Sequence, residues 1–472
     1  MAKLPLGGKN TDYDSKNSRG NLINMIAEAD NDQNYRTIKR CDGLTSFSTG
    51  AGATRSNILV NGGYAYFISG SFLYRVDTLG VASSLGSVGG AGEGQILENS
   101  VPGNNQILVL NGSGAGYIYN NAGLVAITDS DFFPTTSGTV LAERFWFVRD
   151  GTNEFFGSDI SDGFSYDPLT FASAEESPDL CVAIVTKKSS LWVGGTDTLE
   201  FWQSFTDTIL PVRKVRGATI ERGIRSRASL AEIDDIFIFL ADDLTVRMVG
   251  GNSETMISDL DFNLKVRGNG TATMPGFTTT DDAIGFIVDS PTHKIYYLTF
   301  PAEGYTWGYD LKTRLSHTRK SEGLGYWRGK YSAKFGGKII MGDYLSSDIW
   351  TLDPDAKTEG AAILRAQLTT PGISFDHDVT IPLIELDMEV GQIEDPSVSP
   401  QMMVRYTRDG GYSWINHSSI PLGDMGNYRK RVTLRRFGRL VRHKDFQLEL
   451  TVTDGVRVQF YGATIPDLEA MI

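Results

Sequence analysis

Five histidines are the first residues to consider for chemistry, because an imidazole can bind a metal ion or act as a general acid or base. They lie far apart in the sequence, at His293, His317, His377, His417 and His443. The short motifs CxxC, HExxH and GxSxG, which bring metal ligands or a nucleophile together, do not occur. The glycine run at residues 86–94 lacks the GxGxxG spacing of a dinucleotide site, and we expect a loop there. The sequence therefore predicts no catalytic residue, no metal site, no cofactor and no enzymatic activity.

One short motif has a defined local geometry. Residues Thr407–Trp414 (TRDGGYSW) resemble the Asp-box hairpin of sialidases, [ST]-x-D-x-G-x-[TS]-W. In such a hairpin the Asp carboxylate accepts turn amides, glycine allows a positive φ, and Trp packs beneath the loop. The motif occurs once, and it is a structural device even in sialidases. We therefore interpret it as a turn that stabilises a hairpin, in preference to part of a glycosidase site.

Two basic segments stand out against an acidic background. The candidate partner-docking residues of the first basic segment (residues 213–227) are Arg213, Lys214, Arg216, Arg222 and Arg225. Those of the second basic segment (residues 429–444) are Arg429, Arg431, Arg435, Arg436 and Arg439. Neither segment is interleaved with the aromatic residues that stack on single-stranded nucleic acid. Three interpretations remain open: docking onto an acidic protein partner, contact with a DNA phosphate backbone, or a solvated basic strand face.

Composition limits the class of protein. The chain has 472 residues, 40% of them hydrophobic and 11% aromatic, which is enough for a substantial core. The formal net charge of −13 disfavours a protein that grips nucleic acid over its whole surface. It is compatible with a protein that lets DNA pass without adhering, and equally with an acidity that only maintains solubility.

Cysteine content and hydropathy indicate the compartment. The two cysteines, Cys41 and Cys181, are too few for a disulfide framework and fit a reducing environment. The N-terminal residues lack the apolar core of a secretory signal, and no apolar run approaches the roughly 20 residues of a membrane helix. We expect synthesis in the cytoplasm and no membrane insertion.

Strand-length apolar runs separated by turn residues recur along the chain. The clearest example comprises Val182–Thr186, Ser190–Gly194 and Thr198–Trp202, with Lys, Ser, Gly and Asp between them. Similar meanders begin at intervals of roughly 35 to 55 residues, a range typical of propeller blades. We expect an all-β fold that begins with a β-propeller of six or seven irregular blades, whose blades bury each other's faces. A stacked pair of β-sandwiches is the structural alternative.

Changes in texture suggest three parts. The polar residues 1–54 predict an extended N-terminal arm, and residues 55–365 hold the meanders of the propeller. Residues 366–472 contain further strand patterns and predict a C-terminal antiparallel β-sandwich. Helical signals are scarce; residues 169–176 could form a turn or two of helix.

Short stretches along most of the chain resemble the packaged-DNA-stabilisation, or tail hub (nozzle), proteins of lambdoid short-tailed bacteriophages. The similar stretches are Asn24–Glu28, Asp150–Thr152, Phe155-Phe156, Ala174–Asp179, Thr198–Trp202, Gly438–Leu440 and Val456–Ile465. They occur in the same order as in that family. One departure is Cys41–Leu44, where the family resemblance leads us to expect a Pro-Gly turn.

The resemblance implies a structural protein of the virion tail, made in the host cytoplasm, that is not an enzyme. Such proteins form a homo-oligomeric ring, commonly a hexamer, below the portal and the head-to-tail adaptor protein. The ring continues the channel for double-stranded DNA without sequence recognition, retains the packaged genome and docks the tail needle or plug protein. On this hypothesis part of the acidic surplus lies on the channel wall, and the basic segments contact neighbouring subunits or the adaptor.

The alternative hypothesis is a tail-associated propeller that binds or cleaves host glycans, prompted by the single Asp-box. A sialidase-like site would need an arginine cluster, a tyrosine and carboxylates facing one pocket at the blade tops. A tail hub needs an acidic lumen and large surfaces between subunits. The arrangement of charged residues therefore distinguishes the two hypotheses.

Overall fold

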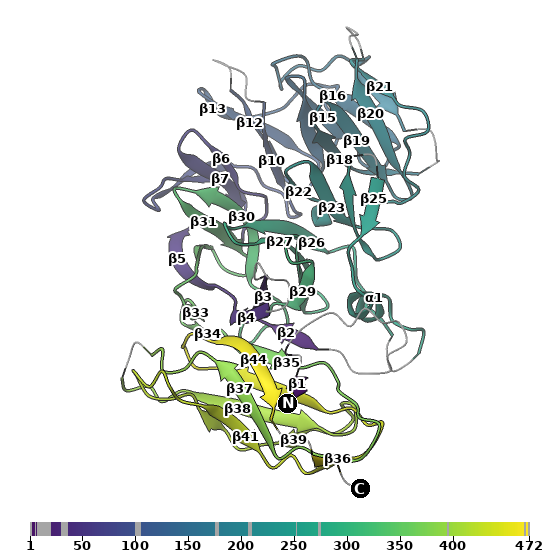
Figure 1. Cartoon of the computed structure of the whole chain (residues 1–472). Helices are drawn as coiled ribbons and strands as arrows, with labels where there is room; N and C mark the ends of the chain where they lie inside the picture. The colour runs from purple at the N-terminus through teal and green to yellow at the C-terminus, as the bar shows by residue number, and fades with distance from the viewer. Residues whose placement is uncertain are drawn as a thin grey trace. The chain divides into compact units, whose positions relative to one another are not determined.

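The structure is a computed structural model (Figure 1) that describes residues 2–4, 6, 20–29, 36–99, 105–174, 179–205, 210–251, 253–271, 275–393, 396–466 and 469–470. Among these residues strands predominate, with one short α-helix, α1 (Leu260–Arg267). No helix in the described part of the chain is long and apolar enough to cross a membrane. The chain divides into two compact units. Unit 1 is Met1–Thr45, Tyr305–Trp327 and Leu352–Ile472, and unit 2 is Ser46–Gly304 and Arg328–Thr351.

Unit 2 consists of small antiparallel sheets that follow one another along the chain, including five four-stranded sheets within the described residues. The first two are β6 (Leu59–Asn61), β7 (Tyr64–Ser69), β8 (Phe72–Val76), β9 (Ala82–Ser87), and β10 (Gln95–Glu98), β11 (Ile107–Leu110), β12 (Gly116–Asn120), β13 (Gly123–Ala126). The next two are β14 (Gly138–Leu141), β15 (Arg144–Val148), β16 (Glu154–Gly157), β17 (Phe171–Ser173), and β18 (Cys181–Lys187), β19 (Ser190–Gly195), β20 (Leu199–Ser204), β21 (Val212–Lys214). The fifth is β22 (Ala231–Ile233), β23 (Ile236–Leu240), β24 (Val246–Gly250), β25 (Ser253–Met256), preceded by a 3₁₀ turn at Arg227–Ser229.

Two hairpins complete unit 2, and two strands run across the division between the units. The hairpins are β26 (Ile284–Asp289) with β27 (Lys294–Phe300), and β30 (Gly329–Phe335) with β31 (Lys338–Asp343). The strands that span the division are β5 (Gly43–Thr49) and β32 (Asp348–Asp353).

Successive sheets of unit 2 pack face to face, which explains why their inner strands are buried throughout and mostly apolar. Every residue of β15 and of β19 is buried, because both faces of these strands lie against other sheets. One core cluster joins β15 and β16 to β18, β19 and β20, and the next joins β18 and β19 to β23 and β24. In the first cluster the ring of Phe155 lies 4.9 Å from that of Trp202, edge to face. Sheets that bury each other in chain order are the packing of a β-propeller.

Unit 1 is a β-sandwich with several short additional strands. One sheet has the order β3 (Met25–Ala29), β4 (Arg36–Arg40), β44 (Gln459–Ile465), β37 (Leu383–Met388), β41 (Val432–Arg435), and β1 (Ala2–Leu4) also pairs with β44. In the other, β28 (Tyr305–Asp310) is followed by β29 (Leu315–Thr318), β2 (Asn21–Ile23), β35 (Ala366–Thr369), β43 (Gln447–Val452) and β38 (Gln401–Thr407), with β39 (Ile415–Asn416) and β40 (Ile420–Pro421) both paired to β38. The short strands are β33 (Thr358–Glu359), β34 (Ala362–Ile363), β36 (Val379–Thr380), β42 (Arg439–Leu440) and β45 (Glu469–Ala470).

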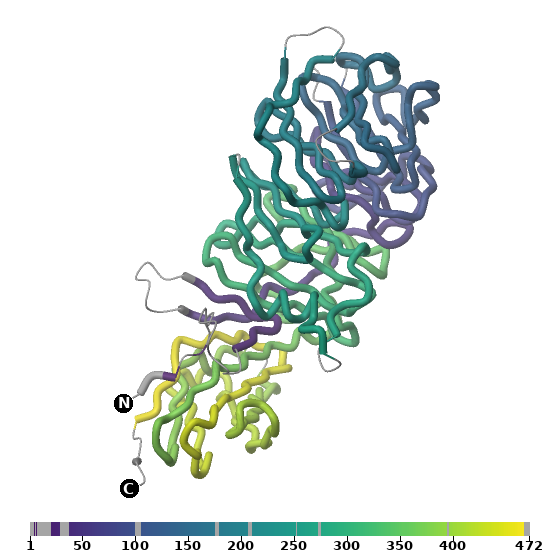
Figure 2. Tube along the Cα trace, turned by 90° about the vertical axis from the view of Figure 1, so that its right-hand side faces the viewer, coloured from purple at the N-terminus to yellow at the C-terminus, as the bar shows by residue number. Residues whose placement is uncertain are grey.

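The core of unit 1 lies between its two main sheets. Leu386 and Phe460 from one sheet, and Leu368 and Leu450 from the other, belong to a single cluster of buried residues. Figure 2 shows the purple N-terminal strands next to the yellow C-terminal ones, in agreement with the pairing of β4 with β44. The two ends of the sequence thus contribute to one sandwich.

The structure confirms the predicted fold class and differs from the sequence-based expectations in detail. The predicted arm is partly built of strands: its described residues include β2 to β5. These strands form because the side chains of Leu22, Met25 and Ala27 are buried in the core of unit 1. The sequence allows a turn or two of helix at residues 169–176; among the described residues 169–174, Phe171–Ser173 instead form β17, which pairs with β16. The predicted boundaries at residues 54 and 365 stay predictions.

Candidate functional site

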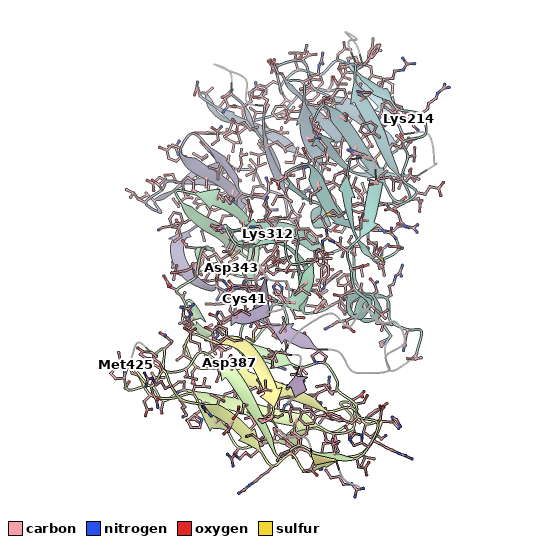
Figure 3. The ribbon with its side chains drawn as sticks, in the orientation of Figure 1. Cys41, Lys214, Lys312, Asp343, Asp387 and Met425 are labelled. Carbon is pink, nitrogen blue, oxygen red and sulfur yellow. The ribbon has the colours of Figure 1, made fainter. Side chains whose placement is uncertain are left out.

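Lys214 of the first basic segment is held by a buried carboxylate. It lies on β21 in unit 2 (Figure 3), and its Nζ is 2.8 Å from Oε1 of Glu200, a residue only 1% exposed. The other carboxylate oxygen of Glu200 accepts a hydrogen bond from Trp202 Nε1 at 3.1 Å. This lysine therefore compensates a buried charge within its own sheet.

The other basic side chains of this segment divide into two kinds. Arg222 lies 3.7 Å from a carboxylate oxygen of Asp243, and Arg225 lies 2.8 Å from one of Asp281. Arg213 and Arg216 are exposed. The structure thus pairs three of the five predicted docking residues with carboxylates of the same chain, but Arg225 and its partner Asp281 are exposed, so Arg213, Arg216 and Arg225 all lie on the surface.

The second basic segment lies on and around β41 and β42 of unit 1. Its apolar residues Val432, Leu434, Phe437 and Leu440 are buried in the sandwich. The predicted docking residues all point outward and are exposed: Arg429, Arg431, Arg435, Arg436 and Arg439. Alternation of buried apolar and exposed basic residues therefore produces one strongly basic surface. Arg439 pairs with Asp378, which neutralises part of it.

The Asp-box hairpin has the internal geometry that its sequence predicts. The Asp409 carboxylate accepts hydrogen bonds from the Ser413 amide at 2.9 Å and from the Thr407 hydroxyl at 2.7 Å. The Ser413 hydroxyl also donates to this carboxylate, and this bond, followed by those from the Ser413 amide and the Thr407 hydroxyl, holds the pKa of Asp409 well below its usual range. Gly410 and Gly411 have φ of 78° and 96°. The carboxylate is thus engaged by its own turn, as expected for a structural motif.

Sequence reasoning missed a buried ionic cluster in unit 2. Lys330 Nζ lies 2.6 Å from Oε1 of Glu93, and the Tyr331 hydroxyl donates to Oε2 of the same carboxylate at 3.0 Å. The Arg227 guanidinium donates to the main-chain carbonyl of Glu93. Three distant parts of the sequence meet here, and no local pattern of residue types marks them.

Asn24, the first residue of the Asn24–Glu28 stretch that carries part of the family resemblance, is the centre of a cluster of hydrogen bonds in unit 1. Asn24, in the Asn24–Glu28 stretch, has a φ of 54°, and its side-chain amide donates to the carbonyls of Lys320 and Arg365 at 2.8 Å each. Its side-chain oxygen accepts from the Lys320 amide at 2.9 Å. Asn24 therefore ties the N-terminal strands to two other segments of unit 1. Within the described residues, no group of three metal-ligating side chains could hold a metal ion.

These observations define an all-β protein in which a propeller is combined with a sandwich, with basic surfaces on both units. A family described as "Bacteriophage P22 Gp10, beta-propeller" matches residues 2–357, and one described as "Bacteriophage P22 Gp10, beta-sandwich" matches residues 365–466. The chain belongs to the bacteriophage P22 Gp10 family. It is a bacteriophage structural protein, a component of the virion, of the family that stabilises packaged DNA. The resemblance stated from short sequence stretches is confirmed, although residues 175–178 of one stretch lie outside the described residues.

Comparisons with other proteins add little to the family assignment. No curated protein matches the chain in sequence. Among solved structures, the computationally designed protein Ika8 is similar at 12% identity, with 65% of this chain and 99% of that chain covered and a TM-score of 0.41. The Pan2 WD40 domain of Neurospora crassa is similar at 10% identity, with 66% and 96% covered and a TM-score of 0.39.

Proposed function

We propose that the protein forms the tail hub ring of a short-tailed phage, a homo-oligomer that continues the DNA channel below the portal and the adaptor. The observation that carries this proposal is the family match, which extends in order over both the propeller and the sandwich. In this role the ring retains the packaged genome and docks the tail needle or plug, without enzymatic activity. Synthesis takes place in the host cytoplasm, and assembly into the virion follows.

The distribution of charge supports the proposed passage of DNA through the ring and the proposed docking of protein partners. The net charge of −13 favours double-stranded DNA that slides through the channel without adhering. The second basic segment is an exposed surface of the opposite sign, suited to an acidic face of the adaptor or of a neighbouring subunit. The Asp-box gives no support to a glycan site, because its carboxylate is bonded within the turn.

The proposal is tested by genome retention. Particles assembled without this protein should lose their DNA to added nuclease, and addition of the wild-type chain should protect it. The double variant Arg435→Glu/Arg436→Glu should protect poorly, because it reverses the charge of the proposed docking surface. The matched control Lys312→Glu/Arg314→Glu changes two exposed cations of unit 1 outside that segment and should protect like wild type. DNA that stays nuclease-resistant in the absence of the protein would refute the proposal.

A further inference from the structure

A surface of unit 1, on and just before β41, carries four exposed arginines that have no carboxylate partner. We call them the basic face: Arg429, Arg431, Arg435 and Arg436. Within the described residues, the ion pair of the second basic segment is made by another arginine, Arg439, with Asp378. β41 is the last strand of its sheet, so the edge that carries the basic face is open to a partner.

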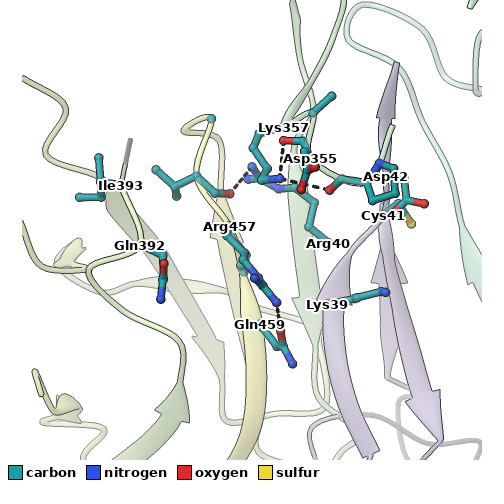
Figure 4. A pocket seen from close by; sticks show the side chains of 15 residues that line it. Lys39, Arg40, Cys41, Asp42, Asp355, Lys357, Gln392, Ile393, Arg457 and Gln459 are labelled. Carbon is teal, nitrogen blue, oxygen red and sulfur yellow. Dashed lines mark hydrogen bonds between the residues drawn. The ribbon is translucent and has the colours of Figure 1, made fainter. Parts of the chain in front are cut away.

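Cations elsewhere in unit 1 are compensated by carboxylates of the chain itself. In the pocket shown in Figure 4, Arg457 lies 3.0 Å from a carboxylate oxygen of Glu389. Burial lowers the pKa of Arg40 to about 10, and the charge of the nearby Asp454 opposes that shift. The basic face differs from this pocket, because its four charges have no ion pair in the described part of the chain.

Two large side chains close to the basic face in the sequence are exposed as well. Met425 (Figure 3) is 55% exposed, and Tyr428, which directly precedes Arg429, is 62% exposed. Arginine, tyrosine and methionine are residue types enriched where proteins contact one another. A DNA backbone, in contrast, is bound by cations and hydrogen-bond donors. The combination therefore favours an acidic protein surface over DNA as the partner.

Unit 2 has a surface of the opposite charge around its third sheet, β14 to β17. We call its carboxylates the acidic face: Asp129, Asp131, Glu143, Asp159, Asp162 and Asp167. Within the described residues these six carboxylates have one ion pair, from Asp159 to the buried Arg144 at 3.9 Å. In sequence, unit 2 holds 32 Asp and Glu residues but only 20 Lys and Arg residues, so it is acidic as a whole.

Contacts between turns show that the acidic face is one surface. The Asp129 carboxylate accepts from the Tyr166 amide at 3.3 Å, and the Glu143 carboxylate accepts from the Ser161 hydroxyl at 2.9 Å. Burial, followed by the charges of Asp129 and Asp162, raises the pKa of the Tyr166 hydroxyl. Residues 129, 143 and 159–167 therefore lie close together although they come from separate connections.

The acidic face also presents apolar side chains to solvent. Ile160 is 61% exposed and Leu169 is 60% exposed. Ile160 lies between two of the carboxylates in the sequence, and Leu169 follows a third, Asp167, whose side chain accepts from the Leu169 amide at 2.9 Å. The basic and acidic faces thus share one character: unpaired charge of a single sign next to exposed apolar groups.

We propose that the basic face of one copy of this chain docks onto the acidic face of a second copy. Every copy carries both faces, and opposite charges on two surfaces favour their encounter and fix their register. Because the two faces are different surfaces, the contact is head to tail, and repeated head-to-tail contacts close into a ring when the rotation between copies allows it. The inference rests on the proposed function, a homo-oligomeric ring, and names the surfaces that join its subunits.

Two complementary variants test this contact. The basic-face variant is Arg435→Glu/Arg436→Glu, and the acidic-face variant is Glu143→Lys/Asp167→Lys. Light scattering of the full chain, alone and with rings of the head-to-tail adaptor, measures association between copies. Each variant by itself should associate about tenfold more weakly than wild type, because attraction becomes repulsion at two exposed positions.

An equal mixture of the two variants should recover association. The unchanged acidic face of the first variant then meets the unchanged basic face of the second, while the two altered faces again have opposite charges at the substituted positions. Recovery would also show that both variants are folded. The controls Lys312→Glu/Arg314→Glu and Asp197→Lys/Glu221→Lys change exposed charges outside the two faces and should associate like wild type.

The outcomes separate this inference from the proposed function. Wild type that stays a monomer with adaptor rings would contradict the proposed function itself. Wild type that assembles, with an acidic-face variant that assembles equally well, would overturn the inference and assign the basic face to another protein such as the adaptor. Short duplex DNA that binds wild type but not the basic-face variant, with association between copies unchanged, would overturn it in favour of a DNA backbone.

Discussion

The Nζ atom of Lys330 lies 2.6 Å from Oε1 of Glu93, although 237 positions separate the two residues in the sequence. Lys330 is on β30, and Glu93 is in the connection between β9 and β10. The Glu93 carboxylate also accepts from Tyr331, and its main-chain carbonyl accepts from Arg227. One residue thus connects three distant segments of unit 2.

Glu93→Gln should strongly destabilise unit 2. Burial lowers the pKa of Lys330 while Glu93 opposes that shift, so removal of the carboxylate leaves a 4%-exposed ammonium without its counter-charge. We expect the free energy of unfolding to fall by about 2 kcal/mol, less than for a fully buried pair, because 23% of the Glu93 side chain is exposed. Urea unfolding followed by tryptophan fluorescence measures this change. Glu221→Gln, at an exposed position, should leave stability nearly unchanged, and an equal effect of both variants would contradict the interpretation.

Lys214→Met separates structural from docking roles in the first basic segment. The variant should reduce the free energy of unfolding by about 2 kcal/mol, because the buried Glu200 carboxylate loses its counter-charge. The loss is smaller than for a fully buried pair because 23% of the Lys214 side chain is exposed. Arg213→Gln and Arg216→Gln remove exposed charges and should change stability little. Differential scanning calorimetry compares the three variants. A wild-type melting curve for Lys214→Met would show that Glu200 does not need this partner.

Asp343 should make the stability of unit 2 depend on pH in the acidic range. Burial alone raises the pKa of this carboxyl, but amides of Ser346 and Leu345 and the side chains of Trp350 and Arg328 donate to it and outweigh burial, so the pKa is lowered. A lowered pKa contributes stability that is full above the unfolded-state value of 3.8 and is lost as pH falls through the folded-state value.

Comparison of wild type with Asp343→Asn tests this expectation. The difference in unfolding free energy should be about 2 kcal/mol at pH 7, from the loss of charge-assisted hydrogen bonds, and should shrink below about pH 4. Thermal unfolding between pH 3 and pH 7 provides the measurement. A difference that stays constant over this range would mean that the carboxylate charge is not the stabilising feature.

The inner strands of unit 2 could be predicted from the sequence because their signal is local. The predicted strands Val182–Thr186 and Ser190–Gly194 agree with β18 and β19 within one residue at each end. Their apolar runs are bounded by turn residues, and burial on both faces requires such runs. The outer strand β21 (Val212–Lys214) was missed, because three residues with two charges give no strand pattern.

Helix α1 and the charge clusters were not predicted, for different reasons. Asp259 caps the helix by accepting from the Phe262 amide at 2.8 Å, and Gly268 follows its last turn with a φ of 72°. Both capping residues are visible in the sequence, but the helix has only eight residues, which are too few to show a clear helical period. The pair of Glu93 and Lys330, in contrast, depends on how distant segments meet. Basic residues could be located from the sequence, but which of them pair internally could not.

Asp409→Ala should loosen the Asp-box hairpin without affecting the rest of unit 1. Without the carboxylate, the Ser413 amide loses its acceptor at 2.9 Å, so its hydrogen should exchange faster with solvent. Hydrogen exchange resolved by mass spectrometry measures the peptide that covers residues 407–414. Asp424→Ala removes an exposed carboxylate that accepts from Ser399 in another loop of unit 1, and it should leave the hairpin unchanged. Unaltered exchange in Asp409→Ala would argue against a structural role for the motif.

The most direct test of the hub assignment is the solution mass of the purified chain, measured by light scattering alone and with rings of the head-to-tail adaptor. The proposed function predicts that the chain assembles on the adaptor rings as a whole-number multiple of its own mass, six in a hexamer. The Arg435→Glu/Arg436→Glu variant should assemble less completely than the Lys312→Glu/Arg314→Glu control. A wild-type chain that remains a monomer in the presence of adaptor rings would contradict the account.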